Sequence, residues 1–338
     1  MADFIETDVV IVGAGPVGLF AAFECGMLRL KSVLVDSLGE VGGQLTALYP
    51  EKPIYDIPGH KAIAAGKLIS DLEEQIEPFA VPRLLGRRVV SLAGGPPGHF
   101  QLITDQGDEI RARAVVVAAG AGAFGPNRPP LQGLEAFEAS GAVQYYVKRR
   151  EDFRGKRVVI AGGGDSAVDW ALSLRDVAAH VAVVHRRAKF RAAPETAAQL
   201  DQAAALGEVE MVIPYQLHAL HGEGGQLSGV EVADLAGGTR VLEADVLLPF
   251  FGLSTDLGPL ADWGLGVEQH RVAIDPATCA TNIPGVFAIG DVTQYPGKLK
   301  LILQGFSEAA MAAHALYSVV HPDQTVHFEH STTRGVIA

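Results

Sequence analysis

Gly13-Ala14-Gly15-Pro16-Val17-Gly18 follows the apolar run Val9-Val10-Ile11-Val12, and Gly162-Gly163-Gly164-Asp165-Ser166-Ala167 follows Val158-Val159-Ile160. Glycines in this pattern allow a tight turn from a strand into a helix. They also let backbone N–H groups approach a pyrophosphate at the positive end of that helix. Because each turn has a strand before it and an amphipathic stretch after it, we expect two Rossmann-like, three-layer α/β units.

The residue 23 positions after the first glycine differs between the two turns (13 to 36 and 162 to 185). In the first turn it is Asp36, an acid that can accept hydrogen bonds from an adenosine ribose. In the second it is His185, followed by Arg186 and Arg187, and such a cluster suits a 2′-phosphate. The first turn is therefore predicted to bind FAD or NAD, and the second NADP.

The predicted NADP contacts combine the second turn with this basic cluster. Arg191 is added because it follows closely in the sequence. An ordinary solvated basic face is the alternative interpretation of the arginines. The full set is Gly162, Gly164, Asp165, Ser166, His185, Arg186, Arg187 and Arg191.

Composition limits the remaining choices. A chain of 338 residues with 48% hydrophobic residues and 39 glycines can bury two layered α/β cores. The formal net charge of −12 argues against nucleic acid or an anionic membrane as partner. Residues 1–8 are acidic rather than basic, so no signal peptide is predicted, and no apolar run approaches the length of a membrane span. We therefore expect a cytoplasmic protein.

The chain contains two cysteines, Cys25 and Cys279, which lie far apart in the sequence. This spacing excludes a CxxC redox pair and a disulfide framework, and a cytosolic setting makes pairing between the two thiols unfavourable. No spacing of histidines or cysteines indicates a metal, so no metal site is predicted.

The second turn lies inside the sequence of the first unit. Glycines and a proline in residues 120–126 suit a crossover between domains.

A third motif lies near the end of the chain. An apolar strand ends in Gly290-Asp291 before an Ala-rich helix expected from about residue 301 to residue 320. An acid at this place can hold the ribityl hydroxyls of a flavin, and the helix N-terminus favours electron density at the pyrimidine edge. A capping Asp in a turn is the alternative.

From these motifs we expect a discontinuous FAD domain with an NADP domain inserted in it. Residues 1–122 and 252–338 are assigned to the FAD domain. Residues 123–251 are assigned to the NADP domain.

Together the motifs resemble those of the low-molecular-weight thioredoxin reductases. More specifically, residues 42–52 (GGQLTALYPEK), 163–170 (GGDSAVDW) and 295–299 (YPGKL) are similar to the thioredoxin-reductase-type ferredoxin–NADP reductases. The resemblance covers nearly the whole chain. Thioredoxin reductases carry a CxxC in the NADPH domain, whereas the corresponding residues 143–152 contain no cysteine. The usual dithiol mechanism is therefore excluded.

The resemblance implies roles for individual residues. Tyr49 would stack on the isoalloxazine ring, as aromatic side chains do through offset stacking. Residues 327–333 would cover the flavin of the other subunit of a homodimer, with His330 stacking and Thr332 near the flavin. Tyr49, His330 and Thr332 are thus the predicted catalytic residues, and no acid or base is predicted. The implied FAD contacts are Gly13, Gly15, Pro16, Val17, Gly18, Asp36, Gln44, Leu45, Tyr49, Val89, Phe124, Gly290, Asp291 and Thr332.

The implied activity is that of an FAD-dependent ferredoxin (or flavodoxin)–NADP⁺ reductase. Hydride would pass between NADPH and flavin N5, with one-electron exchange to an iron–sulfur or flavin carrier. The alternatives are an NADPH-dependent reductase of a separate disulfide protein or quinone, and a low-turnover flavin redox sensor. An NADH oxidase is disfavoured by residues 185–187.

Because ferredoxins and flavodoxins are acidic, docking needs a local basic patch on this protein. Residues 87–88, 148–150 and 154–157 are the candidates, and ordinary solvated faces are the alternative interpretation.

Overall fold

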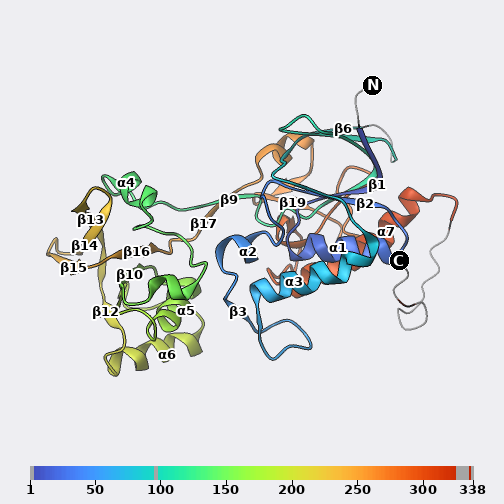
Figure 1. The fold of residues 1–338 in the computed structure, drawn as a ribbon. Coiled ribbons are helices and arrows are strands. Elements are labelled where there is room, and N and C mark those ends of the chain that lie inside the picture. The colour runs from blue at the N-terminus through green and yellow to red at the C-terminus, as the bar shows by residue number, and fades with distance from the viewer. Residues whose placement is uncertain (1–3, 95–97, 325–334, 336–338) are drawn as a thin grey trace. The chain divides into compact units, whose positions relative to one another are not determined.

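The computed structural model describes residues 4–94, 98–324 and 335. The chain forms two compact units: unit 1 comprises Met1–Phe124 and Thr255–Ala338, and unit 2 comprises Gly125–Ser254 (Figure 1). Unit 2 is therefore inserted in the sequence of unit 1. The two strands at the boundary, β9 (Ala123–Pro126) and β17 (Leu253–Asp256), pair with each other. The predicted fold class, one α/β unit inserted into another, is confirmed.

Unit 1 is built on a seven-stranded sheet. The long strand β8 makes two kinds of pairing: residues 109–112 run antiparallel to β7, and residues 115–117 run parallel to β20. The segment that follows unit 2 is thereby joined to the segment that precedes it. The strand order is β5 (Arg83–Leu85), β2 (Ser32–Asp36), β1 (Phe4–Val12), β8 (Glu109–Val117), β7 (Phe100–Thr104) and β6 (Val89–Gly94), with β20 (Val286–Ala288) paired to β8.

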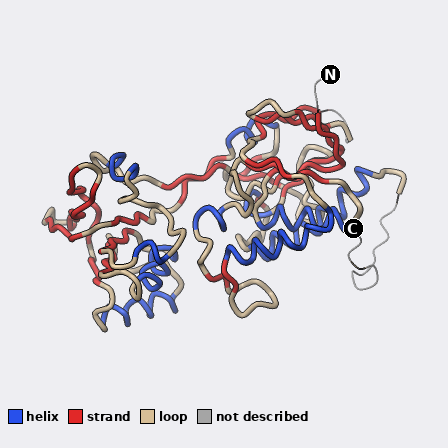
Figure 2. Tube along the Cα trace, viewed as in Figure 1, coloured by secondary structure: helices blue, strands red, loops and turns tan. Residues whose placement is uncertain are grey.

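Different elements cover the two faces of this sheet. Successive side chains of β1 point to opposite faces and so belong to two different cores. Val9 and Ile11 belong to a core shared with the helices α1 (Pro16–Met27), α3 (Ala65–Ile76) and α7 (Ile302–Val320). Val10 belongs to the core on the opposite face, which includes Phe100 and Trp263. Figure 2 shows the helices of unit 1 along one side of its sheet.

The remaining elements of unit 1 are short. Residues 39–60 contain the helix α2 and the strand β3. A helix of about one turn is too short to leave a periodic apolar pattern in the sequence. These elements are α2 (Gln44–Leu48), β3 (Pro53–Ile54), β4 (Ile63–Ala64), β18 (Val267–Glu268), β19 (Arg271–Ala273), β21 (Thr293–Gln294) and the 3₁₀ turns Glu77–Phe79, Gly258–Trp263 and Gly290–Val292.

Unit 2 repeats the parallel α/β pattern. Val159 and Val184 of its parallel sheet share a core with Val230 and Val232 of an antiparallel sheet. The parallel sheet has the order β12 (Glu210–Val212), β11 (His180–Val184), β10 (Arg157–Ala161) and β16 (Val246–Pro249); the antiparallel sheet consists of β13 (Tyr215–Glu223), β14 (Gln226–Asp234) and β15 (Thr239–Glu243). The helices are α4 (Leu134–Ala139), α5 (Asp165–Leu174) and α6 (Pro194–Ala205), with a 3₁₀ turn at Arg150–Phe153.

None of the helices in the described part of the chain combines the length and the apolar character needed to cross a membrane.

Candidate functional site

The first glycine turn is shaped by close backbone packing. A Cβ atom on Gly13 would collide with the Ala118 carbonyl, and one on Gly18 would collide with the Gly13 carbonyl. At Gly15, in contrast, no heavy atom lies within 4 Å of the position that a Cβ would take. Gly15 caps α1, and Pro16 opens it. The turn therefore presents an open cradle at a helix N-terminus, which fits the pyrophosphate of a dinucleotide.

Asp36 ends β2 and lies directly beside this cradle. Its Oδ2 accepts a hydrogen bond from the Ala14 amide at 2.6 Å, and its Oδ1 accepts one from the Leu38 amide at 2.8 Å. Burial raises the pKa of the Asp36 carboxyl, and the two hydrogen bonds oppose this shift. Since a carboxylate has about four acceptor positions, two remain for ribose hydroxyls. Asp36 thus fixes the turn, and its remaining acceptor positions fit the predicted hydrogen bonds to an adenosine ribose.

The segment from Gly42 to Tyr49 closes one side of the cradle. The Gly42 amide donates to the Ala14 carbonyl at 2.8 Å, and the Cβ position of Gly43 lies 3.3 Å from the Cα of Gly15. Gln44 then begins α2, and Leu45 is buried beneath it.

Tyr49 ends α2 and is half-buried, with the ammonium group of Lys52 5.9 Å from its ring centroid. Burial raises the pKa of the Tyr49 hydroxyl, and the charge of Asp291 adds to the shift. Such an electrostatic effect requires proximity, so the fold brings together two predicted flavin contacts that are 242 positions apart in the sequence (291 minus 49).

Gly290 and Asp291 form a 3₁₀ turn after β20. Gly290 has a φ of +76°, which favours glycine, and its Cβ position lies 3.5 Å from both γ-methyl groups of Val17. The first turn and the Gly290-Asp291 turn are therefore in direct contact. Within residues 4–94, 98–324 and 335, the Asp291 carboxylate accepts no hydrogen bond, so its acceptor positions fit ribityl hydroxyls.

Other predicted FAD contacts are less informative. Val89 is buried at the start of β6. Phe124 lies in β9, but its side chain is outside the described part of the structure. His330 and Thr332 also lie outside the described residues, so their roles stay predictions.

The second glycine turn has the same plan in unit 2. The Gly164 residue caps α5, and no heavy atom lies within 4 Å of its Cβ position. A Cβ on Gly163 would collide with the imidazole ring of His185. Gly163 is absent from the predicted contacts. Three consecutive glycines in the sequence were the available sign that this middle position also has no room for a side chain.

His185 supports this turn through the packing of its ring. Its ring stacks on the Phe190 ring, with the centroids 5.0 Å apart. Burial lowers the pKa of His185; a hydrogen bond with the Lys189 backbone opposes the shift, and the charges of Arg191, Arg186 and Arg187 add to it. The exposed arginines beside it carry permanent charge, which fits a phosphate.

Residues 185–193 fold back onto the turn. The Arg191 amide donates to the Gly163 carbonyl at 2.7 Å, and the Ala193 amide donates to Asp165 Oδ1 at 2.8 Å. Arg186, Arg187, Arg191 and the neighbouring Ser166 are exposed. The three guanidinium groups are thus carried on a segment fastened beside the open face of Gly164, which fits a dinucleotide with a 2′-phosphate.

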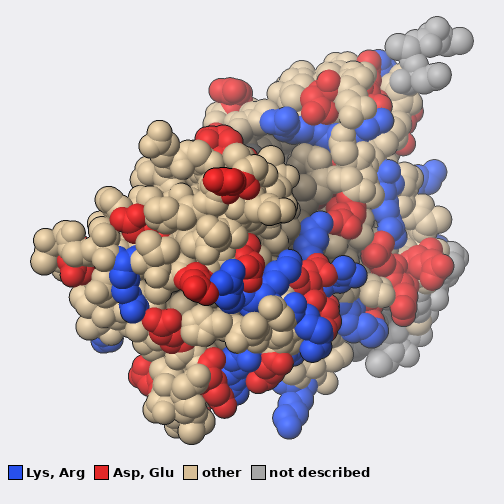
Figure 3. All heavy atoms as spheres, turned by 60° about the vertical axis from the view of Figure 1, so that its left-hand side comes forward, with Lys and Arg blue, Asp and Glu red and all other residues tan. Residues whose placement is uncertain are grey.

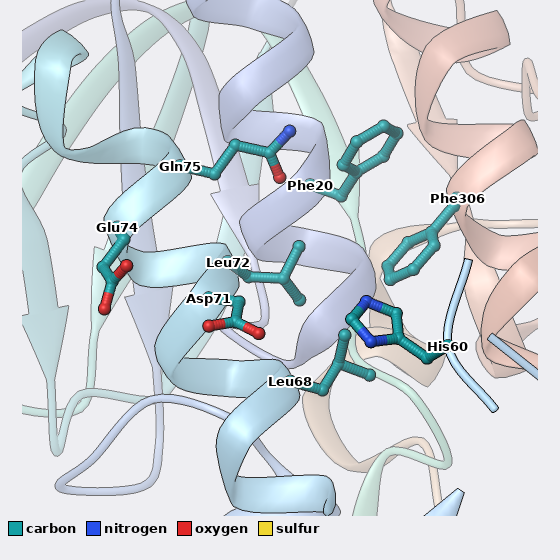
Figure 4. Close-up of a pocket in the computed structure, with 8 residues that line it drawn as sticks. All are labelled: Phe20, His60, Leu68, Asp71, Leu72, Glu74, Gln75 and Phe306. Carbon is teal, nitrogen blue, oxygen red and sulfur yellow. The ribbon is translucent and has the colours of Figure 1, made fainter. Parts of the chain in front are cut away.

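A cavity of about 510 Å³ lies elsewhere in unit 1, among α1, α3 and α7. Figure 4 shows the rings of Phe20 and Phe306 at one end and the carboxylates of Asp71 and Glu74 at the other. His60, Leu68, Leu72 and Gln75 complete the lining. These residues are not among the predicted nucleotide contacts. Within the described residues, no group of three or more His, Cys, Asp or Glu side chains could hold a metal ion.

Comparison with known proteins agrees with this geometry. The profile of the pyridine nucleotide-disulphide oxidoreductase family matches residues 7–315. Among solved structures, thioredoxin reductase of Lactococcus lactis superposes with a TM-score of 0.79 at 26% identity, covering 94% of this chain and 99% of that one. Thioredoxin reductase of T. acidophilum gives 0.78 at 25% identity, covering 93% and 98%. The chain belongs to the pyridine nucleotide-disulphide oxidoreductase family.

Within this family, close relatives place the chain among the ferredoxin–NADP reductases. The ferredoxin–NADP reductase of Granulibacter bethesdensis is 72% identical over 332 residues, which cover 98% of this chain and 95% of the relative. The ferredoxin–NADP reductase of Acidiphilium cryptum is 70% identical over 336 residues, which cover 99% of each.

The open position at Gly15 gives a direct test of the first cradle. Gly15 has a φ of −70°, so Gly15→Ala fits the backbone and leaves the melting temperature unchanged. Its methyl group would occupy the space above the turn, and we expect FAD affinity to fall by about tenfold or more. Titration of apoprotein with FAD, followed by flavin fluorescence, measures this. Gly39→Ala, where the Cβ position is also open, is the control. Wild-type affinity in Gly15→Ala would contradict the cradle.

The arginines of unit 2 give a second test. We expect Arg187→Ala to raise the KM for NADPH by roughly 10- to 150-fold, the equivalent of one charged hydrogen bond, and to leave the KM for NADH unchanged. Steady-state reduction of ferricyanide with each nucleotide measures both values. Arg154→Ala removes an exposed arginine that pairs with Glu151 and should change neither. An equal rise in KM for NADPH and for NADH would show that Arg187 does not contact the 2′-phosphate.

Proposed function

We propose that this protein is an FAD-dependent ferredoxin–NADP⁺ reductase. Bound FAD supplies the redox chemistry, since a flavin accepts a hydride from NADPH and releases electrons singly. The observation that carries the proposal is the combination of two dinucleotide cradles of opposite charge with the absence of cysteine from the sequence of unit 2. Electrons must therefore leave the protein without an internal dithiol.

The two cysteines that do occur cannot take the place of such a dithiol. Cys25 lies in α1 and Cys279 also lies in unit 1, and both are buried free thiols. Burial raises the pKa of each to about 12. The thiolate that reacts with disulfides is therefore almost absent at neutral pH. This favours an iron–sulfur carrier over a disulfide as acceptor.

The contribution of the chain is binding and orientation. In unit 1, Gly15 and the N-terminus of α1 would hold the FAD pyrophosphate, and Asp36 would hold the ribose. Tyr49 and Asp291, which lie close together, would contact the flavin and its ribityl chain. In unit 2, Arg187 and its neighbouring arginines would hold NADPH. No proton transfer by a side chain is needed, so positioning accounts for the catalytic effect.

The basic patches predicted for carrier docking are largely neutralised by neighbouring acids. Arg87 and Arg88 pair with Asp108 and Asp105. In unit 2, Arg149 pairs with Asp152, Arg154 with Glu151, and Arg157 with Glu243 and Asp245. Figure 3 shows basic and acidic side chains interspersed on the face in view. Docking of an acidic carrier is therefore expected to depend on cations outside these pairs, such as Lys148.

Three finer points belong to the same proposal. Flavodoxin serves as an alternative carrier, because it too exchanges single electrons. The protein works in the cytoplasm, which its two buried free thiols support. It is a homodimer, and the support is the resemblance of residues 327–333 to the C-terminal extension of the family.

The activity is tested by NADPH-driven reduction of cytochrome c with FAD-loaded protein. We expect the rate to depend strongly on added ferredoxin and to fall between low and high salt, because opposite charges steer the encounter. Flavodoxin should replace ferredoxin in the same assay. Rapid flavin reduction by NADPH without any carrier dependence would favour a disulfide or quinone acceptor. Slow reoxidation by every acceptor would favour a redox sensor.

The homodimer is tested by light scattering coupled to gel filtration. We expect a mass of twice the 35.6 kDa chain, about 71 kDa. Removal of residues 327–338 should leave the protein dimeric and increase the oxidase activity of the reduced flavin, because the flavin loses its cover. A monomeric wild-type protein would contradict the assignment of the C-terminal segment.

A further inference from the structure

Glu308 is a buried carboxylate that no step of the proposed reaction uses. It lies in α7 and is 3% exposed. A buried charge is costly unless it is paired and hydrogen-bonded. Its contacts should therefore reveal why it is there.

Both oxygens of Glu308 are engaged. Oε2 accepts a hydrogen bond from the Gly290 amide at 2.6 Å. Oε1 accepts one from the Tyr295 hydroxyl and one from the Lys298 ammonium group, each at 2.5 Å. The Lys298 side chain is itself only 2% exposed. Gln304 extends the network, since its amide donates to the Tyr295 hydroxyl and its Oε1 accepts from the Leu299 amide at 2.9 Å.

Tyr295 is held in the network as a donor. Burial raises the pKa of its hydroxyl, and the hydrogen bond and charge of Glu308 add to this shift. Through Tyr295, Lys298 and Gln304, the network fastens residues 295–299 to the first two turns of α7. A buried ion pair often stabilises a fold no more than apolar side chains of similar volume would. The Lys298–Glu308 pair is therefore better explained by the geometry that it holds than by a gain in stability.

The backbone that Glu308 holds is the turn that carries Asp291. Gly290 has a φ of +76°, and the Thr293 hydroxyl donates to its carbonyl at 2.8 Å. Val17, in the first turn of α1, contacts the same glycine from the other side and also packs against Gly305 of α7 so closely that a Cβ there would collide with it. Glu308 is thus the polar contact from α7 that holds the Gly290 amide, between the N-termini of two helices.

We propose that Glu308 is a positioning residue for the flavin: its carboxylate fixes the Gly290 amide, so that Asp291 and the N-terminus of α7 face the cofactor in one arrangement. This inference rests on the proposed function, because it takes FAD to be the ligand of the turn. Glu308 itself acts through Gly290 and does not contact the cofactor.

The test compares two double variants that both remove the buried charges. Lys298→Met/Glu308→Gln keeps an acceptor for the Gly290 amide, whereas Lys298→Met/Glu308→Leu does not. Because neither leaves an unpaired buried charge, both are expected to fold. The readouts are the FAD affinity of the apoprotein, the visible spectrum of the bound flavin and the melting temperature of the apoprotein. Asp245→Asn, which disrupts an ion pair with Arg157 in unit 2, is the control.

We expect the glutamine double variant to bind FAD at least about fivefold more tightly than the leucine double variant, the value of one hydrogen bond. The flavin spectrum should change in the leucine variant alone. Asp245→Asn should lower the melting temperature and leave FAD affinity unchanged. Equal FAD affinities and equal spectra in the two double variants would overturn the inference.

Failure of the proposed function gives a different result. A wild-type protein that binds FAD but reduces cytochrome c without any dependence on ferredoxin would contradict the function, while the FAD affinities still decide the role of Glu308. A wild-type protein that binds no FAD would overturn both.

Discussion

The close approach of the α1 N-terminus to the end of β1 is the constraint on which the rest of unit 1 depends. Gly13 and Gly18 have no room for a side chain, because the Ala118 and Gly13 carbonyls occupy the places that a Cβ would take. This contact leaves the position above Gly15 open. It also brings Val17 against Gly290 and Gly305, so the same short turn sets the position of the segment that returns after unit 2.

The pairing of β8 explains how a discontinuous chain forms one site. Its first half pairs antiparallel with β7, and its second half pairs parallel with β20, which arrives only after residue 254. Asp291 follows β20 at the carboxyl ends of the parallel strands, where ligands bind in open α/β sheets. The pairing of β20 with β8 therefore returns the chain to the sheet of unit 1 just before Gly290 and Asp291.

The two cradles share backbone geometry and differ in charge. Asp36 binds the Ala14 amide of its own turn and keeps acceptor positions free. In unit 2 the equivalent position is filled by His185, whose ring packs against Gly163, and exposed arginines lie beside it in the sequence. The proposed selection between nucleotides thus rests on few side chains, while both turns share the same strand–turn–helix plan.

The sequence by itself determined the two strand–turn–helix units, their order and the chemistry expected of Asp36 and Arg187, because these depend on residues that are neighbours along the chain. The absence of a cysteine pair was equally evident without a structure. Only the tertiary structure decided that Tyr49 lies near Asp291, that Gly163 must make room for His185, and that Glu308 holds Gly290. It also showed that the arginines at 87–88 and 154–157 are paired with acids. These contacts join residues far apart in the chain, and strand register and helix packing fix them; neither can be deduced from local patterns.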